Sequence, residues 1–105
     1  MADTLKTLAT TIKERRVSDP ALSYVAKLFS KGSEAIAQKV GEEATEVVIA
    51  AMGGDPAKLT NEAADLIFHL MILLEQGGVS MDDVLVELNR REGQSGLVEK
   101  AGRKD

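Results

Sequence analysis

Two acidic pairs, one on each side of a short turn signal, constrain the fold of this chain more than any other feature. Glu43 and Glu46 are three residues apart in one helical pattern, and Glu62 and Asp65 have the same spacing in the next. Gly53-Gly54-Asp55-Pro56 lies between them and predicts the end of one helix and the start of an antiparallel one. Because side chains three residues apart share a helical face, this hairpin can bring four carboxylates together.

Four carboxylates on facing helices repel one another, so a cation among them would stabilise the arrangement, and hard divalent cations prefer such oxygen ligands. The alternative is a solvated charged face, which is the commoner meaning of a single Glu-x-x-Glu spacing. Here two pairs occur on adjacent helical segments, and apolar residues border both of them. Solvated faces more often pair Glu with Lys four residues later. The spacing therefore favours a metal site and leaves the charged face as the alternative.

Helical periodicity covers nearly the whole chain, and no alternating strand pattern occurs. We expect helices at about residues 3–16, 23–30, 34–53, 56–76 and 81–92. The fold class is therefore all-α, with a bundle of about four to five helices around a central antiparallel helix hairpin. Residues 1–92 are expected to form a single domain, and residues 93–105 a polar C-terminal tail.

Three capping signals support these helix starts. Asp55 followed by Pro56 is a cap with proline at the first helical position. Ser80 with Asp83 resembles a capping box. Ser33 is expected to cap the helix that carries the first acidic pair, after Gly32 ends the helix before it.

The segment from Leu66 to Leu74 is apolar on every face except at His69. A helix that is apolar all round is buried all round, and a chain of 105 residues cannot easily cover such a helix by itself. We therefore expect a second subunit to complete the bundle, most simply in a twofold dimer. The alternative is the central helix of a monomeric bundle.

The composition excludes several classes of function. A net charge of −4 argues against a general nucleic-acid binder. The longest nearly apolar stretch is far shorter than the roughly 20 residues that span a bilayer. The absence of cysteine excludes disulfides and zinc fingers, and the first residues lack the pattern of a signal peptide. We expect a cytoplasmic protein with neither nucleic acid nor membrane as a partner.

Three segments of the sequence resemble those of a known family. The segments Ser23–Gly32, Ile36–Ala51 and Asn61–Leu70 are similar to those of phosphoribosyl-ATP pyrophosphohydrolases, and the resemblance extends over most of the chain. Its most specific part is Lys39-Val-Gly-Glu-Glu-Ala-Thr-Glu46. The broader pattern of the four acids is shared with the MazG-like nucleoside triphosphate pyrophosphohydrolases, an all-α superfamily whose members are usually dimeric or larger and use magnesium.

The resemblance implies a reaction. It is hydrolysis of the α–β phosphoanhydride of 1-(5-phosphoribosyl)-ATP, giving 1-(5-phosphoribosyl)-AMP and pyrophosphate, an early step of histidine biosynthesis. In many bacteria this activity is fused to a cyclohydrolase domain, and this chain looks like the stand-alone form. Mg²⁺ held by carboxylates can bridge phosphate oxygens and acidify an attacking water, which explains the need for clustered acids.

The resemblance also implies roles for the acids. Glu43, Glu46, Glu62 and Asp65 are the expected ligands of Mg²⁺, and Glu42, Glu43 and Glu46 are the expected catalytic group. Because Mg²⁺ takes only one or two carboxylates per ion, so many acids suggest more than one ion, or one acid left free as a base. Glu42 remains a candidate ligand, supporting group or base.

Cations must bind the phosphates of such a substrate. The candidates are Lys27, Lys31, Lys39, Arg90 and Arg91. For each of them the alternative is a solvated surface cation. Lys39 lies in the most specific block, which favours a role with phosphate or in a structural ion pair.

Two aromatic side chains complete the candidates. Tyr24 is a candidate for stacking on adenine or covering the site, with a place in the core as the alternative. His69 has three interpretations, as a metal ligand, as an acid or base, or as a donor that orients Asp65. A lone histidine on an apolar helix is most often a satisfied core residue, so we favour the core or the orienting donor.

Two other functions fit the same residues. One is a different MazG-like enzyme that removes pyrophosphate from a non-standard deoxynucleotide, which a panel of substrates would distinguish. The other is a non-catalytic helical dimerisation module, which would hydrolyse no nucleotide and need no Mg²⁺. A ferritin-like di-iron site is disfavoured, because neither acidic pair is the Glu-x-x-His that such sites need.

Overall fold

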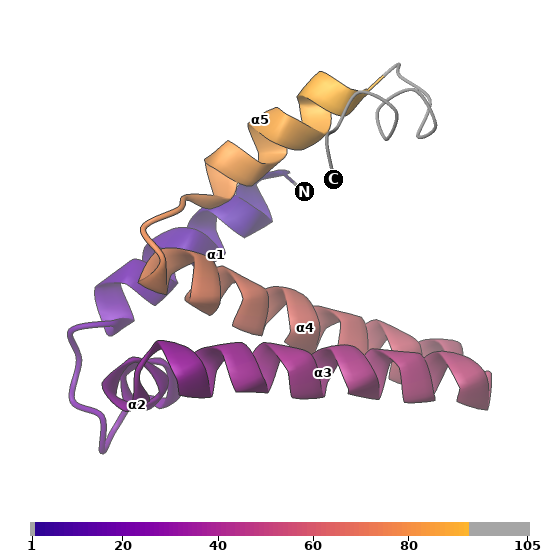
Figure 1. Cartoon of the computed structure of the whole chain (residues 1–105), viewed down its shortest axis with the longest axis horizontal. Coiled ribbons are helices and arrows are strands. Elements are labelled where there is room, and N and C mark those ends of the chain that lie inside the picture. The colour runs from indigo at the N-terminus through magenta and orange to yellow at the C-terminus, as the bar shows by residue number, and fades with distance from the viewer. Residues whose placement is uncertain (1, 93–105) are drawn as a thin grey trace.

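The computed structural model describes residues 2–92, which form five α-helices and no strand (Figure 1). The helices are α1 (Ala2–Arg15), α2 (Tyr24–Lys31), α3 (Ser33–Gly53), α4 (Pro56–Gln76) and α5 (Met81–Arg91). Each bound differs from the expected one by a single residue or not at all. The all-α bundle around an antiparallel hairpin is thereby confirmed. The predicted tail, residues 93–105, lies outside the described residues.

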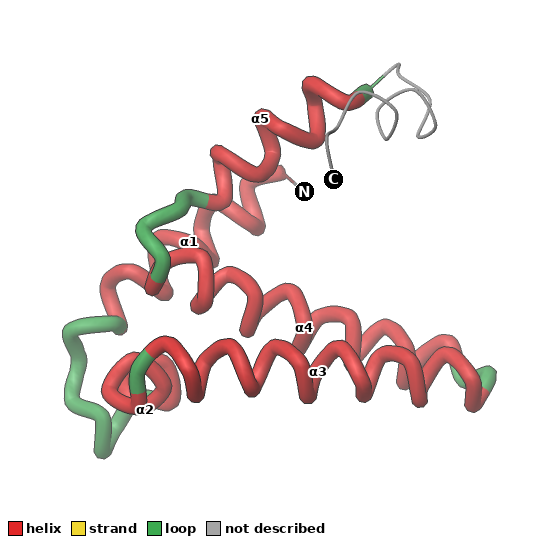
Figure 2. Tube along the Cα trace, viewed as in Figure 1, coloured by secondary structure: helices red, strands yellow, loops and turns green. Residues whose placement is uncertain are grey.

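The hairpin of α3 and α4 forms the centre of the fold. The two helices have 21 residues each and lie side by side along their length (Figures 1 and 2). Gly54 ends α3 in the left-handed conformation, with φ of 80°, which glycine adopts without steric cost. The carboxylate of Asp55 then caps α4 by accepting from the backbone N–H groups of Ala57 at 3.0 Å and Lys58 at 3.4 Å. The turn signal read from the sequence therefore acts as predicted.

The expected cap at Ser33 is wrong. Ser33 is the first residue of α3, and Gly32 occupies both the end of α2 and the cap position of α3. Because this single residue, with φ of 91°, makes the whole turn, no separate capping position remains. The Ser33 hydroxyl instead accepts from Gln76 Nε2 at 3.0 Å, which joins the start of α3 to the end of α4. The capping box at Ser80 and Asp83 is confirmed.

The hydrophobic core lies at one end of the hairpin, where α1 and α2 pack against it. It is built from the fully or almost fully buried side chains Ile12, Val25, Leu28, Ile36, Met71 and Ile72. Figure 1 shows the opposite end, with the loop between α3 and α4, projecting away from the other three helices. Large apolar side chains are exposed there on α3, including Val48, Ile49 and Met52.

Arg16 joins three helices at the end of the molecule that contains the hydrophobic core. Its Nη1 donates to the Glu75 carboxylate at 2.9 Å and to the Glu75 carbonyl at 3.2 Å. The guanidinium also lies 4.7 Å from the centre of the Phe29 ring. One side chain thus connects the end of α1 with α2 and with the end of α4. Within residues 2–92, no helix combines the length and the apolar character that crossing a membrane requires.

Candidate active site

Three of the four predicted metal ligands meet in the middle of the hairpin. Glu43 on α3 and Glu62 and Asp65 on α4 each offer a carboxylate oxygen, and these oxygens lie within 4.8 Å of one another. We call these residues the carboxylate trio. Glu43 is the deepest member, with 9% of its surface exposed. The antiparallel packing of α3 on α4 brings the trio together, as the spacing of the two acidic pairs predicts.

The other two predicted acids lie outside the trio. Glu46 is one turn further along α3 and is exposed. Glu42 is also exposed, and its carboxylate accepts from Gln38 Nε2 at 3.3 Å. Their predicted roles, as a ligand for Glu46 and as a ligand, supporting group or base for Glu42, stay predictions.

Lys39 lies close to two acidic side chains of its own helix, one of them a member of the trio. Its ammonium lies 3.3 Å from a carboxylate oxygen of Glu43 and 3.9 Å from one of Glu42. The hydrogen bond to Glu43 raises the pKa of the Lys39 ammonium above its ordinary value, against a smaller opposite effect of desolvation. Lys39 therefore stays charged and offsets part of the negative charge of Glu43.

His69 uses both of its ring nitrogens. It is 6% exposed, its Nδ1 lies 2.7 Å from the backbone carbonyl oxygen of Asp65, and its Nε2 lies 2.7 Å from the Tyr24 hydroxyl. The predicted contact with Asp65 is thus present, but with the main chain rather than with the carboxylate. Neither nitrogen is left for a metal ion in this arrangement.

Tyr24 borders the site from α2. Its hydroxyl is held by His69 while about half of the residue, 49%, remains exposed. Partial burial is the main reason that the pKa of the Tyr24 hydroxyl is raised above its ordinary value. The Lys39 ammonium opposes that shift, and the neighbouring carboxylates reinforce it. Tyr24 is therefore a neutral hydrogen-bond donor at physiological pH.

A cavity of about 330 Å³ opens beside the trio, between α2 and the first half of α3. Its lining includes Tyr24, Lys31, Lys39 and Glu42, four of the residues that the sequence selects. We call it the lysine cavity. Lys39 lines it and also touches Glu43, so a ligand in the cavity would lie next to the carboxylate trio. Lys27, a further candidate on α2, is exposed and is not among the lining residues.

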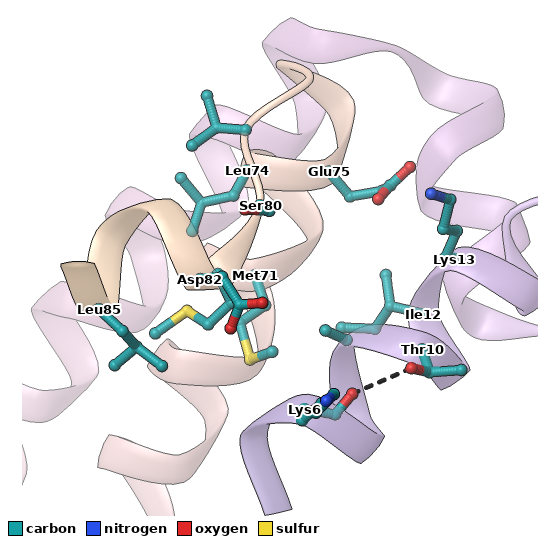
Figure 3. A pocket seen from close by; sticks show the side chains of 13 residues that line it. Lys6, Thr10, Ile12, Lys13, Met71, Leu74, Glu75, Ser80, Asp82 and Leu85 are labelled. Carbon is teal, nitrogen blue, oxygen red and sulfur yellow. Dashed lines mark hydrogen bonds between the residues drawn. The ribbon is translucent and has the colours of Figure 1, made fainter. Parts of the chain in front are cut away.

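A larger cavity of about 470 Å³ lies elsewhere, between α1, α4 and α5 (Figure 3). Its lining is mostly apolar, with Ile12, Met71 and Leu85 among the residues drawn. Figure 3 also shows Thr10 donating to the Lys6 carbonyl, at 3.1 Å, on its α1 wall. No member of the carboxylate trio lines it, so size alone does not identify the chemical site.

The two arginines of α5 bind a carboxylate of their own helix. Both guanidiniums donate to Glu87, at 2.8–2.9 Å from Arg90 and 2.9 Å from Arg91. These hydrogen bonds lower the pKa of Glu87 to about 2. Neither arginine lines the lysine cavity, so their predicted role in binding substrate within one subunit gains no support from the fold and stays a prediction.

The donor set of the trio suits a hard divalent cation. It consists of carboxylate oxygens, the ligands that Mg²⁺ and Ca²⁺ prefer, and the chain has no cysteine. Its single histidine is already bonded through both nitrogens. A soft or nitrogen-preferring metal would find few ligands here.

Comparison with known proteins gives a consistent result. The family model described as phosphoribosyl-ATP pyrophosphohydrolase matches residues 5–92. The chain is 62% identical over 103 residues to a phosphoribosyl-ATP pyrophosphatase of Rhizorhabdus wittichii, covering 98% of this chain and 97% of the relative. It is 62% identical over 99 residues to that of Novosphingobium aromaticivorans, covering 94% and 92%. With the protein of the same description from Erythrobacter litoralis it shares 59% over 103 residues, covering 98% and 99%.

Proposed function

Because this chain belongs to the phosphoribosyl-ATP pyrophosphohydrolase family, we propose that the carboxylate trio and the lysine cavity form the active site of a phosphoribosyl-ATP pyrophosphatase. The enzyme hydrolyses the α–β phosphoanhydride of 1-(5-phosphoribosyl)-ATP to 1-(5-phosphoribosyl)-AMP and pyrophosphate, in histidine biosynthesis. The observation that carries the proposal is the meeting of three acids from both arms of the hairpin beside a cavity lined by lysines.

The trio is the proposed site of Mg²⁺. When bound, the ion would neutralise phosphate oxygens and lower the pKa of a coordinated water. Glu43, Glu62 and Asp65 would hold it, with Glu46 one turn away on the same helix as a further ligand. Because Mg²⁺ rarely takes more than two carboxylates, the remaining acids suit either a second ion or the removal of a proton from the attacking water.

Lys31 and Lys39 are the proposed phosphate ligands. Both line the lysine cavity, and Lys39 lies between the cavity and the trio. A polyphosphate that reached from the cavity to the trio would meet positive charge on one side and the metal-binding acids on the other. Tyr24, half-exposed at the cavity wall, is the proposed neighbour of the adenine or ribose.

A second copy of the chain is the proposed cover for the hairpin. Within α4, His69, Met71 and Ile72 are buried by the chain itself, whereas Ile67 and Leu70 remain 44% and 37% exposed. Exposed apolar side chains also lie on α3 of the same hairpin. These exposed apolar side chains on both helices of the hairpin support an interface with a second copy.

The dimer would also enlarge the site. The lysine cavity of about 330 Å³ lies at the lower end of the range for small ligands, about 300–1,000 Å³, although phosphoribosyl-ATP is a large nucleotide. We propose that the partner copy supplies further cations, with Arg90 and Arg91 or the tail beyond residue 92 as the sources. The cytoplasmic location expected from the sequence stays a prediction.

The test is release of pyrophosphate from phosphoribosyl-ATP, measured with Mg²⁺, without it, and with EDTA. We expect turnover that EDTA abolishes and Mg²⁺ restores. A non-standard deoxynucleoside triphosphate serves as the substrate control and should be hydrolysed far more slowly. Preference for that control would replace the proposed substrate, and full activity in EDTA would contradict the metal site.

A further inference from the structure

Three ring side chains pack together between α2 and α4, next to the carboxylate trio. The rings of Tyr24 and Phe68 are stacked, with centroids 6.4 Å apart and planes at 18°. His69 meets both of them edge-on, at centroid distances of 5.7 Å and 5.3 Å. Tyr24 and His69 are the only tyrosine and the only histidine of the chain.

The hydrogen bonds around His69 define which atoms carry hydrogens. The Asp65 carbonyl can only accept, so the Nδ1 atom of His69, 2.7 Å away, must carry the hydrogen. In the neutral ring Nε2 then has no hydrogen and accepts from the Tyr24 hydroxyl at 2.7 Å. We call this series of two hydrogen bonds, from Tyr24 through His69 to the Asp65 carbonyl, the Tyr24–His69 link.

The link connects the two halves of the proposed site. Tyr24 lies at the first position of α2 and forms part of the wall of the lysine cavity. His69 lies one turn beyond Asp65 on α4, the helix that supplies two of the three clustered acids. The cavity wall and the helix of the proposed metal ligands are therefore joined by one hydrogen bond across 45 residues of sequence, from Tyr24 to His69. The second hydrogen bond, within α4, holds the His69 ring against the backbone of Asp65.

Packing alone does not require these hydrogen bonds. A phenylalanine at position 24 would keep the ring contact with Phe68, and an aliphatic residue could fill the space of a buried imidazole. The polar pair adds a directional contact between α2 and α4, which would set the orientation of the two helices more narrowly than apolar packing does. A bound polyphosphate that spans the lysine cavity and the trio would depend on that orientation.

We infer that the Tyr24–His69 link holds the wall of the lysine cavity in register with the carboxylate trio, so that Tyr24 and His69 are positioning residues for the hydrolysis. The inference rests on the proposed function. Neither side chain needs to touch the reacting atoms. Misplacement of bound groups by about 1 Å can reduce a rate by about 100-fold, which is why such a link matters to the chemistry.

Two single variants and their combination test the link. Tyr24→Phe removes only the hydroxyl. His69→Asn keeps an amide N–H near the place of Nδ1, which can still donate to the Asp65 carbonyl, and removes the acceptor for Tyr24. We expect each to lower kcat by about 10-fold or more with a smaller change in KM, because a displaced cavity wall would hold the bound phosphates out of line with the trio. Because both variants break the same bond, the double variant should be no slower than the slower single variant.

Phe68→Leu is the matched control. It removes a ring from the same cluster but leaves both partners of the Tyr24 hydrogen bond, so its kcat should stay within about twofold of wild type even if its Tm falls. The inference is overturned if Tyr24→Phe retains wild-type kcat, if the two single losses multiply, or if Phe68→Leu loses as much kcat as Tyr24→Phe.

Two further measurements do not depend on turnover. In protein labelled with ¹⁵N-histidine, the single histidine should show the tautomer with its hydrogen on Nδ1, and Tyr24→Phe should shift the Nε2 resonance. A hydrogen on Nε2 in the wild type would refute the link. Mn²⁺ binding, followed by electron paramagnetic resonance, should be about the same in Tyr24→Phe as in the wild type, because Tyr24 is not a member of the trio and all three carboxylates stay in place. A parallel loss of Mn²⁺ affinity would overturn the positioning role. Inactivity of the wild type on phosphoribosyl-ATP would instead refute the proposed function, and the inference with it.

Discussion

Replacing Asp65 by Asn should make the metal-free protein more stable and inactive at the same time. In the folded chain the Asp65 carboxylate has two like-charged neighbours, Glu43 and Glu62, with ligand oxygens within 4.8 Å. Two unit charges at that distance repel by about 1 kcal/mol in a water-like dielectric and by about 3 kcal/mol at an effective dielectric of 20. Asp65 is accessible to solvent, so the lower figure applies. Loss of two repulsions then stabilises the fold by about 1–2 kcal/mol.

Thermal unfolding in EDTA measures this gain. For a domain of this size, about 1 kcal/mol corresponds to a rise in Tm of about 4–8 °C. Addition of Mg²⁺ should raise the Tm of the wild type, because a ligand that binds only the folded state stabilises it. Asp65→Asn should show much less of this rise, and its turnover should be lost.

A matched control separates the trio from other acids. Glu14 is exposed on α1 and lies outside the trio, so Glu14→Gln should leave Tm, the effect of Mg²⁺ and turnover unchanged. A Tm for Asp65→Asn below that of the metal-free wild type would refute the electrostatic reasoning. Retained turnover at saturating Mg²⁺ would refute the assignment of Asp65 as a ligand.

Three further predictions address the other parts of the molecule. Glu46→Gln should lower turnover by at least about 10-fold at saturating Mg²⁺ if Glu46 is a ligand, whereas an unchanged rate would exclude it. Leu70→Lys, at an exposed position, should give a protein with reduced activity that is folded by circular dichroism and monomeric by sedimentation. Leu73→Lys, at a position packed against the core, should instead unfold the chain. A Leu70→Lys variant that remains a dimer would contradict the proposed interface. The carboxyl group of Glu87, followed by NMR of its carboxyl carbon, should titrate near pH 2. Because the pKa of Glu87 is lowered in the folded chain, its ion pairs contribute stability above the ordinary pKa of a glutamate and lose it as the pH falls through about 2. A midpoint near the ordinary pKa would contradict these contacts.

The hairpin could be predicted because its signals are local. Asp55 followed by Pro56, and the glycines before them, determine where one helix ends and the next begins. The spacing of the acids likewise determines that each pair shares a face of its helix. Spacing does not determine which member of a pair points at the opposite helix. Glu43 does so and is buried, whereas Glu46, one turn away, is exposed.

Contacts between distant segments could not be predicted in the same way. The bond from Tyr24 to His69 and the clamp of Arg16 on Glu75 depend on how α1 and α2 are rotated against α4. That rotation follows from the packing of the whole core, and no short pattern encodes it. The error at Ser33 has a related cause. The sequence marks a helix start there, but a one-residue connection through Gly32 leaves the serine no room to cap.

Glu43 is the residue at which this fold departs most clearly from what stability alone would favour. A carboxylate that is 9% exposed in a helix interface loses hydration, and such a loss is normally compensated by hydrogen bonds or an opposite charge. Lys39 supplies one partner at 3.3 Å, yet the opposite helix contributes two more carboxylates rather than cations or donors. A neutral or apolar residue at this position would pack against α4 without that repulsion. Sequences usually break such local rules where function requires it, so the burial of Glu43 among like charges is itself an argument that a cation belongs there.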